Sequence, residues 1–159
     1  MEKNHDINMW IIRVGNGNNF RNSRYPFWGV KSGRGNTIKS FIKNNMKTGD
    51  VLWFLTSKIH GGKLIGMATY TTFYDRRDEP LVNINTLTNK EQHWIGDEEW
   101  NIEIHYSSFY DTERQDICLC IQCAAVIMNY NTFKHKIKED LYLHYNNFKY
   151  YGTPSNKYS

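Results

Sequence analysis

The residues best suited to chemistry in this chain lie in one short loop, residues 31–36, with the sequence Lys-Ser-Gly-Arg-Gly-Asn. The loop follows an apolar run at 27–30 that predicts a strand, and it precedes apolar residues at helical spacing. A glycine-containing loop at a helix start exposes several backbone N–H groups, and Lys31 and Arg34 add positive charge. Trp28 adds a flat surface on which a planar ring can stack. The loop is a candidate nucleotide site, or else a plain strand-to-helix connection, because it has neither Walker A nor G-x-G-x-x-G spacing.

A second polar loop, residues 15–19, follows the first predicted strand and has the sequence Gly-Asn-Gly-Asn-Asn. An amide side chain presents a donor beside an acceptor, which matches the edge of a nucleobase. Asn16 and Asn18 are therefore candidate base contacts, together with Arg13 at the end of the strand. The alternative interpretation is a tight turn, in which Gly and Asn supply positive φ angles.

The chain contains five tryptophans, three of which are candidate stacking surfaces: Trp28, Trp94 and Trp100. Each of these three is equally compatible with core packing. Trp53 differs because it lies in a wholly apolar run, 51–55, which predicts a strand buried on both faces.

No pattern in the sequence indicates catalysis or metal binding. The six histidines lack H-x-x-x-H spacing, no G-x-S-x-G motif occurs, and the acids at 97–99 are typical of solvated surface. Cys118, Cys120 and Cys123 are too clustered for a disulfide framework, so we expect buried thiols in a reducing compartment. The sequence therefore predicts an intracellular protein that is not an enzyme and has no cofactor or metal.

Positive charge is concentrated near the candidate loop. The net charge is +4, but residues 1–49 hold nine basic and two acidic side chains, whereas residues 50–128 hold six and twelve. This asymmetry favours an oriented site for a polyanion, although solvated charged faces produce the same pattern. No apolar run approaches the roughly 20 residues of a membrane helix, so we expect no membrane partner.

The order of predicted elements indicates an α+β domain. Strands are predicted at 7–14, 27–30, 51–55, 63–74, 100–106 and 117–128, and helices at about 37–46, 88–94 and 131–141. Thr88 or Asn89 is expected to cap the second helix, with Glu91 in its first turn. We expect a flexible leader at 1–8, a single domain at 9–150 and a tail at 151–159. About six mostly antiparallel strands with flanking short helices suit a small curved sheet or open barrel.

The order of several short motifs over residues 9–128 resembles the EVE branch of the PUA-like superfamily, which is a sibling of the YTH domains. The motifs are the strand end at 13–17, Trp28-Gly29-Val30, Lys47-x-Gly49-Asp50, the stretch 62–68 with the sequence Gly-Lys-Leu-Ile-Gly-Met-Ala and a later strand that contains a tryptophan. The resemblance implies a PUA-like pseudo-barrel with an aromatic pocket that accepts a flipped or single-stranded base. Several relatives bind a modified base in this pocket.

Carried over to this chain, the resemblance implies that the loop after Val30 lines the pocket and that Ser32 offers backbone groups to the base. Trp94 falls where a cage tryptophan is expected. Lys31 stands where YTH domains have a second cage tryptophan, so Trp28 or Trp100 is the alternative second wall. The expected partner is RNA or DNA. The alternative is a protein-interaction role with a non-functional pocket. The full set of candidate base-binding residues is Arg13, Asn16, Asn18, Trp28, Lys31, Ser32, Arg34, Asn36, Trp94 and Trp100.

Overall fold

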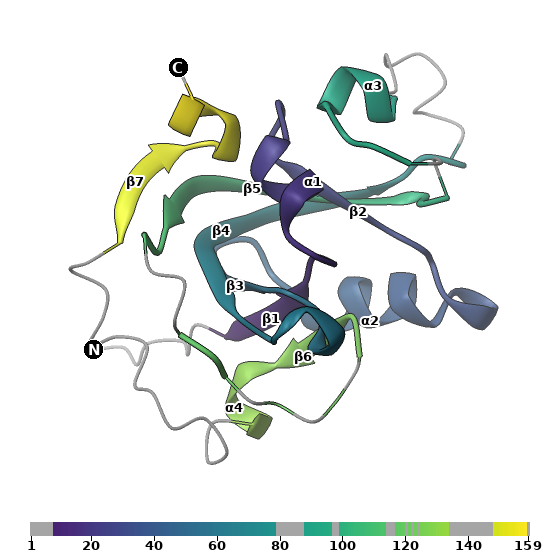
Figure 1. Cartoon of the computed structure of the whole chain (residues 1–159). Coiled ribbons are helices and arrows are strands. Elements are labelled where there is room, and N and C mark those ends of the chain that lie inside the picture. Colours follow the sequence, from purple (N-terminus) through teal and green to yellow (C-terminus); the bar gives the residue numbers. More distant parts are fainter. Residues whose placement is uncertain are drawn as a thin grey trace, which may run out of the picture.

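One mixed, unclosed β-sheet organises the protein (Figure 1). The structure is a computed structural model that describes residues 8–158 apart from 79–87, 97–98, 114–116, 120, 122, 124 and 134–147. In the described residues the sheet has seven strands, ordered β2-β5-β4-β3-β1-β6, with β7 paired to β5. The strands are β1 (Met9–Arg13), β2 (Phe27–Val30), β3 (Val51–Leu55), β4 (Leu64–Asp75), β5 (Ile102–Asp111), β6 (Ile127–Asn129) and β7 (Lys149–Gly152). Only the β1–β3 pair among them is parallel.

The helices of the described residues are short and lie outside the sheet. They are α1 (Asn18–Asn22), α2 (Thr37–Asn45), α3 (Asn89–Gln92) and α4 (Tyr130–Phe133), with 3₁₀ turns at Arg34–Asn36, Lys58–His60 and Pro154–Tyr158. The predicted cap of α3 is confirmed: the Thr88 hydroxyl accepts from the Glu91 N–H, and the Glu91 carboxylate accepts from the Thr88 N–H. The α+β class and the predominance of antiparallel pairs are as the sequence predicted.

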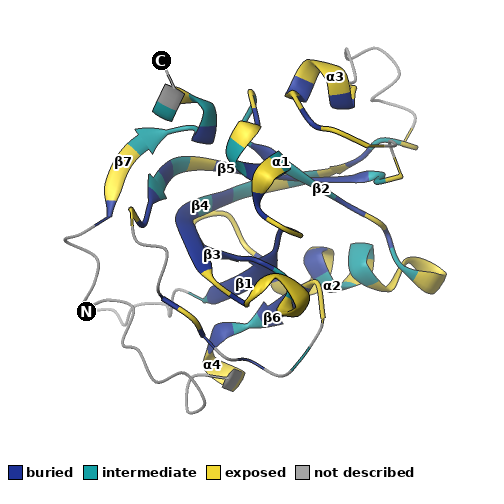
Figure 2. Ribbon diagram, in the orientation of Figure 1, coloured by how far each residue is buried: buried dark blue, intermediate teal, exposed yellow. Residues whose placement is uncertain are grey.

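Two hydrophobic clusters form because strand residues alternate between the faces of the sheet. Trp10 and Ile12 of β1 belong to the first cluster, and Met9 and Ile11 belong to the second. All five residues of β1 are buried, as Figure 2 shows for the centre of the sheet. The predicted burial of β3 on both faces also holds, since Trp53 is fully covered between β1 and β4.

Strands β4 and β5 approach each other closely at Gly66. A Cβ atom on Gly66 would lie 2.9 Å from Cζ of Phe109, so only glycine allows this approach. The register between β4 and β5 shifts twice, once between Met67 and Thr69 and once between Tyr70 and Thr72. Such shifts mark β-bulges, which bend a sheet.

Three expectations about chain segments need correction. No helix is predicted between the strands at 7–14 and 27–30, but α1 covers 18–22. The strand expected at 117–128 is reduced in the described residues to β6 and an isolated bridge between Lys63 and Cys118. The expected tail, 151–159, instead contains the end of β7 and a 3₁₀ turn. Lys157 of that turn forms an ion pair with Asp111, which anchors the segment to β5.

Other expectations lie partly outside the described residues. Residues 1–7 of the proposed leader and 134–141 of the proposed last helix are not described. Cys118, expected to be buried, is exposed, because its neighbours Ile117 and Leu119 turn inward instead. No helix among the described residues is long and apolar enough to cross a membrane.

Candidate functional site

A hollow of ≈ 340 Å³ opens beside the end of β2. Its walls come from β2, the loop that follows, the first turn of α2, the end of β1 and the residue before β6. The lining residues are Arg13, Trp28, Gly29, Val30, Lys31, Gly33, Ile38 and Val126. Its volume lies at the lower end of the range for small-molecule sites and is sufficient for one heterocycle. The hollow therefore lies next to the loop that the sequence singled out.

The edge of β2 that is not paired to β5 borders this hollow. The carbonyls of Pro26 and Val30 accept hydrogen bonds from the N–H groups of Tyr106 and Asn101. Hydrogen-bonded pairs alternate along antiparallel strands, so Gly29 turns its own N–H and carbonyl away from β5. Strand β2 stands at the end of the strand order β2-β5-β4-β3-β1-β6. The Gly29 N–H and carbonyl therefore form a donor and an acceptor at the edge of the sheet.

Trp28 is the one candidate tryptophan that lines the hollow. Its ring is half-buried and packs edge-on against Phe20, at a centroid distance of 6.0 Å, and against Trp94, at 5.0 Å. These contacts hold the indole in one orientation. Trp28 therefore supplies a pre-positioned aromatic wall.

Trp94 lies behind Trp28 instead of forming the wall that the family resemblance implied. The residue is only 6% exposed, and its indole N–H donates to the Ser23 hydroxyl at 2.8 Å. The ring also packs edge-on against Phe27. The loop that follows α3 directs Trp94 inward because the Trp94 N–H donates to the Asn89 carbonyl. Trp94 thus supports the site without reaching the hollow.

Trp100 is also committed to packing. Its ring lies on Gly29, where a Cβ atom would be 2.6 Å from Cγ of the indole. The indole N–H donates to the Asn89 side chain at 2.6 Å, and the Arg76 guanidinium covers the ring at 4.1 Å. Trp100 is therefore not among the residues that line the hollow, and its stacking role is not supported by its placement.

Arg13 borders the hollow, but its guanidinium has a structural task. The side chain is almost fully buried and donates to the carbonyls of Thr56, Ile121 and Cys123, at 2.7–3.1 Å. Burial lowers the pKa of Arg13. The Arg13 side chain thereby satisfies the carbonyls of Ile121 and Cys123. The expected contact of this guanidinium with nucleic acid is thus replaced by a role in the fold.

The cations of the loop differ in their surroundings. Lys31 lines the hollow, its side chain is 70% exposed, and its ammonium group lies 3.3 Å from the Glu99 carboxylate. Arg34 is exposed in the 3₁₀ turn that precedes α2. Lys31 is therefore the loop cation at the hollow, whereas Arg34 is not among the residues that line it.

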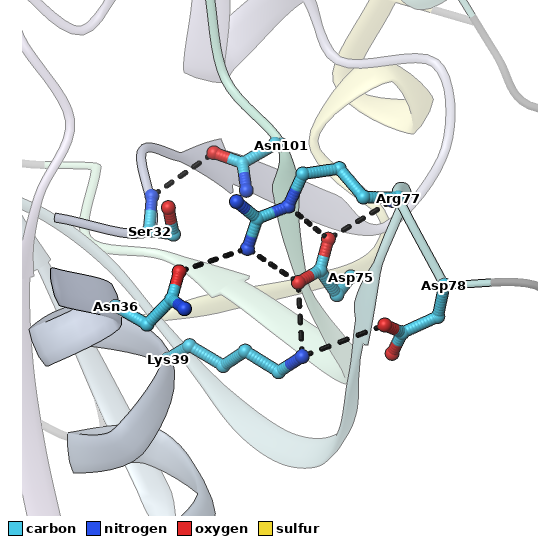
Figure 3. Close-up of polar contacts among 7 residues, drawn as sticks. All are labelled: Ser32, Asn36, Lys39, Asp75, Arg77, Asp78 and Asn101. Atoms are coloured by element: carbon cyan, nitrogen blue, oxygen red, sulfur yellow. Dashed lines mark hydrogen bonds and ion pairs between the residues drawn. The ribbon is translucent and has the colours of Figure 1, made fainter.

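The remaining loop residues are held by a polar network that the sequence did not reveal (Figure 3). Asn36, a candidate base contact, lies at the N-cap position of α2, and its side chain accepts from Arg77 at 3.0 Å. Ser32 is buried, and its N–H donates to the Asn101 side chain at 3.0 Å. Its carbonyl accepts from the first N–H groups of α2, which anchors the helix start. The loop is consequently rigid at both ends.

Asp75 is the centre of this network (Figure 3). Its buried carboxylate accepts from Nε and Nη2 of Arg77, at 2.8 and 2.6 Å, and from Nζ of Lys39 at 3.0 Å. The hydrogen bonds from Arg77 hold the pKa of Asp75 well below its usual range. Because Arg77 also binds Asn36, Asp75 links the end of β4 to the candidate loop. The charged run after β4 was the only sequence signal of this arrangement.

The asparagine-rich loop does not reach the hollow. The Asn16 side chain accepts from the Asn18 N–H, which makes a local turn, and both residues are exposed. The third amide, Asn19, donates to the Ile95 carbonyl and accepts from its N–H. The loop therefore positions the segment near residue 95. Its hydrogen bonds support the interpretation of this loop as a turn.

The described residues contain no group of three or more side chains placed to hold a metal ion. Comparison with known proteins gives no further guide, since no protein-family model, no curated protein and no solved structure shows a significant match to this chain. The candidate site is accordingly defined by its geometry: an aromatic wall at Trp28, a strand edge at Gly29 and a cation at Lys31.

Proposed function

We propose that this chain is a non-catalytic nucleic-acid-binding module of the PUA-like type, related to EVE domains, and that it accepts one base, modified or unmodified, beside Trp28. The observation that supports this proposal best is the hollow itself, which combines an indole, apolar side chains and a lysine. A nucleobase requires the same combination: a face to stack on, a polar edge to pair with and a cation near its phosphate.

The wall residues suit a planar, largely apolar ring. Trp28 lines the hollow together with three aliphatic residues, Val30, Ile38 and Val126, whose apolar surface favours burial of a ring from water. Base–aromatic stacking contributes about 1–3 kcal/mol per base. The edge groups of Gly29 then supply the donor and acceptor that orient a base.

The test is a fluorescence-anisotropy screen of short RNA and DNA oligonucleotides, modified and unmodified, at two salt concentrations. We expect Trp28→Ala to weaken binding by about 5- to 150-fold, which is the loss of one stacking interaction. Lys31→Glu should weaken it most at low salt, because ion screening reduces phosphate contacts. Tyr150→Ala is the matched control, since Tyr150 is an exposed aromatic residue outside the hollow.

Thermal denaturation of each variant separates loss of binding from loss of fold. Lys31 is mostly exposed, so Lys31→Glu should leave the melting temperature nearly unchanged. Unchanged affinity in both folded variants would reject the proposal.

The alternative is a protein-interaction role in which the hollow stays unused. Two fully projecting apolar side chains favour it: Ile59 is 86% exposed and Ile95 is 84% exposed. Absence of oligonucleotide binding in the screen, together with reduced affinity of Ile95→Ala for a protein partner, would support this second function.

A further inference from the structure

Residues 99–101 lie against β2 and the loop that follows it. The Asn101 N–H donates to the Val30 carbonyl at 3.1 Å, and the Asn101 side chain accepts from the Ser32 N–H at 3.0 Å. Trp100 is held on β2 by its contact with Gly29. These contacts fix the backbone that directly follows Glu99. This fixed backbone keeps the Glu99 carboxylate near Lys31 at the mouth of the hollow.

The partner of Glu99 is the lysine that the proposed base site uses. Glu99 Oε1 lies 3.3 Å from Nζ of Lys31, and Lys31 lines the hollow. Both side chains are about two-thirds exposed, so the ion pair is formed in water and can exchange with another anion. A phosphate group that approaches Lys31 has to share the ammonium group with this carboxylate or displace it.

We propose that Glu99 is an internal competitor for Lys31, which a nucleic-acid phosphate displaces when a ligand binds. This inference rests on the proposed function for its ligand. Glu99 lowers the affinity for a bare phosphate backbone, so that only a ligand that also fills the hollow binds strongly. The carboxylate thus raises the concentration at which any phosphate-bearing ligand binds, by the same factor for each ligand, without touching the base.

The expected effect is modest because the pair is exposed. An exposed ion pair changes an equilibrium by about two- to fivefold at low salt, and less as salt screens it. We expect Glu99→Gln, which keeps the shape of the side chain and removes its charge, to raise affinity by this factor. The factor should be equal for an oligonucleotide with all its bases and for one with an abasic position.

The experiment compares wild type, Glu99→Gln, Lys31→Gln and the double variant, using two fluorescein-labelled ten-nucleotide single strands. One strand carries all its bases and the other has a central abasic site, and both are titrated at about 50 and 200 mM salt. Glu113→Gln is the matched control, because Glu113 also lies 3.3 Å from a lysine, Lys157, away from the hollow.

If Glu99 is a competitor, Glu99→Gln binds both strands more tightly than wild type. The gain in affinity is absent when Lys31 is already replaced, and Glu113→Gln binds with the affinity of wild type. A gain that persists in the Lys31→Gln background would be a general charge effect and would overturn the inference, as would the absence of any gain. Failure of the base site has a different result: wild type would bind the complete and abasic strands equally, whatever Glu99 does.

Discussion

Replacement of Asp75 by asparagine tests the network that holds the candidate loop. The Asp75 side chain is 1% exposed and accepts two hydrogen bonds from the Arg77 guanidinium, one from the Arg77 N–H and one from Lys39. Asparagine has nearly the same shape but no charge. The substitution therefore removes the charge from four contacts, turns one acceptor oxygen into an NH2 donor that faces other donors, and leaves packing almost intact.

The expected loss of stability depends on how far Asp75 and its two partners, Lys39 and Arg77, are buried. Removal of one member of a buried ion pair costs about 3–5 kcal/mol, and a single hydrogen bond to a charged group is worth about 1.5–3 kcal/mol. Lys39 and Arg77 remain 27% and 51% exposed, so water can solvate them once the carboxylate is neutral. We therefore expect Asp75→Asn to lower the free energy of unfolding by about 2–3 kcal/mol at pH 7.

The same reasoning fixes the dependence on pH. The pKa of Asp75 is lowered in the folded protein by its hydrogen bonds with Arg77, so the carboxylate contributes stability above its unfolded pKa of about 4. That contribution is lost as pH falls below about 4 toward the folded pKa. The difference in stability between wild type and Asp75→Asn should accordingly shrink between about pH 5 and pH 3.

Urea denaturation followed by tryptophan fluorescence at pH 7, 5 and 3 measures this difference. Asp78→Asn is the control, because Asp78 is largely exposed and contacts Lys39 only at 3.5 Å, and it should change stability by less than about 0.5 kcal/mol. A difference between wild type and Asp75→Asn that stays constant with pH would refute the role of the charge.

Two further predictions concern packing near the site and in the core. Gly29→Ala should lower the free energy of unfolding by about 1–3 kcal/mol in thermal denaturation, because the new Cβ atom would overlap the Trp100 ring. A variant as stable as wild type would show that the indole has room to move. Tyr106→Phe should be neutral or stabilising by up to about 1 kcal/mol in urea denaturation, since the buried hydroxyl has no hydrogen-bond partner within the described part of the chain. A clear loss of stability would instead indicate a partner for that hydroxyl.

Local sequence patterns predicted the strands and helices in which buried residues recur at the period of that element. The apolar run at 51–55 became a strand buried on both faces, and the strand predicted at 100–106 was found as the beginning of β5. The cap at Thr88 was also readable, because a capping box needs only residues three positions apart.

The sequence did not show which tryptophan lines the hollow. Trp94 is buried and donates a hydrogen bond to Ser23, 71 residues away along the chain, and Trp100 is half-buried where it packs against Gly29. Neither contact leaves a periodic trace in the sequence. The proposed tail was assigned as irregular for the same reason, since its order depends on pairing with β5 and on Asp111.

By itself, the sequence determined the α+β class, the main strands and the position of a basic, glycine-containing loop after Trp28. Tertiary structure alone decided that Trp28 faces the hollow, that Asp75 holds the loop, and that Glu99 lies beside Lys31. The physical reason is that period-2 and period-3.6 patterns record only whether a residue faces inward. Which side chain it meets there depends on strand pairings between distant parts of the chain.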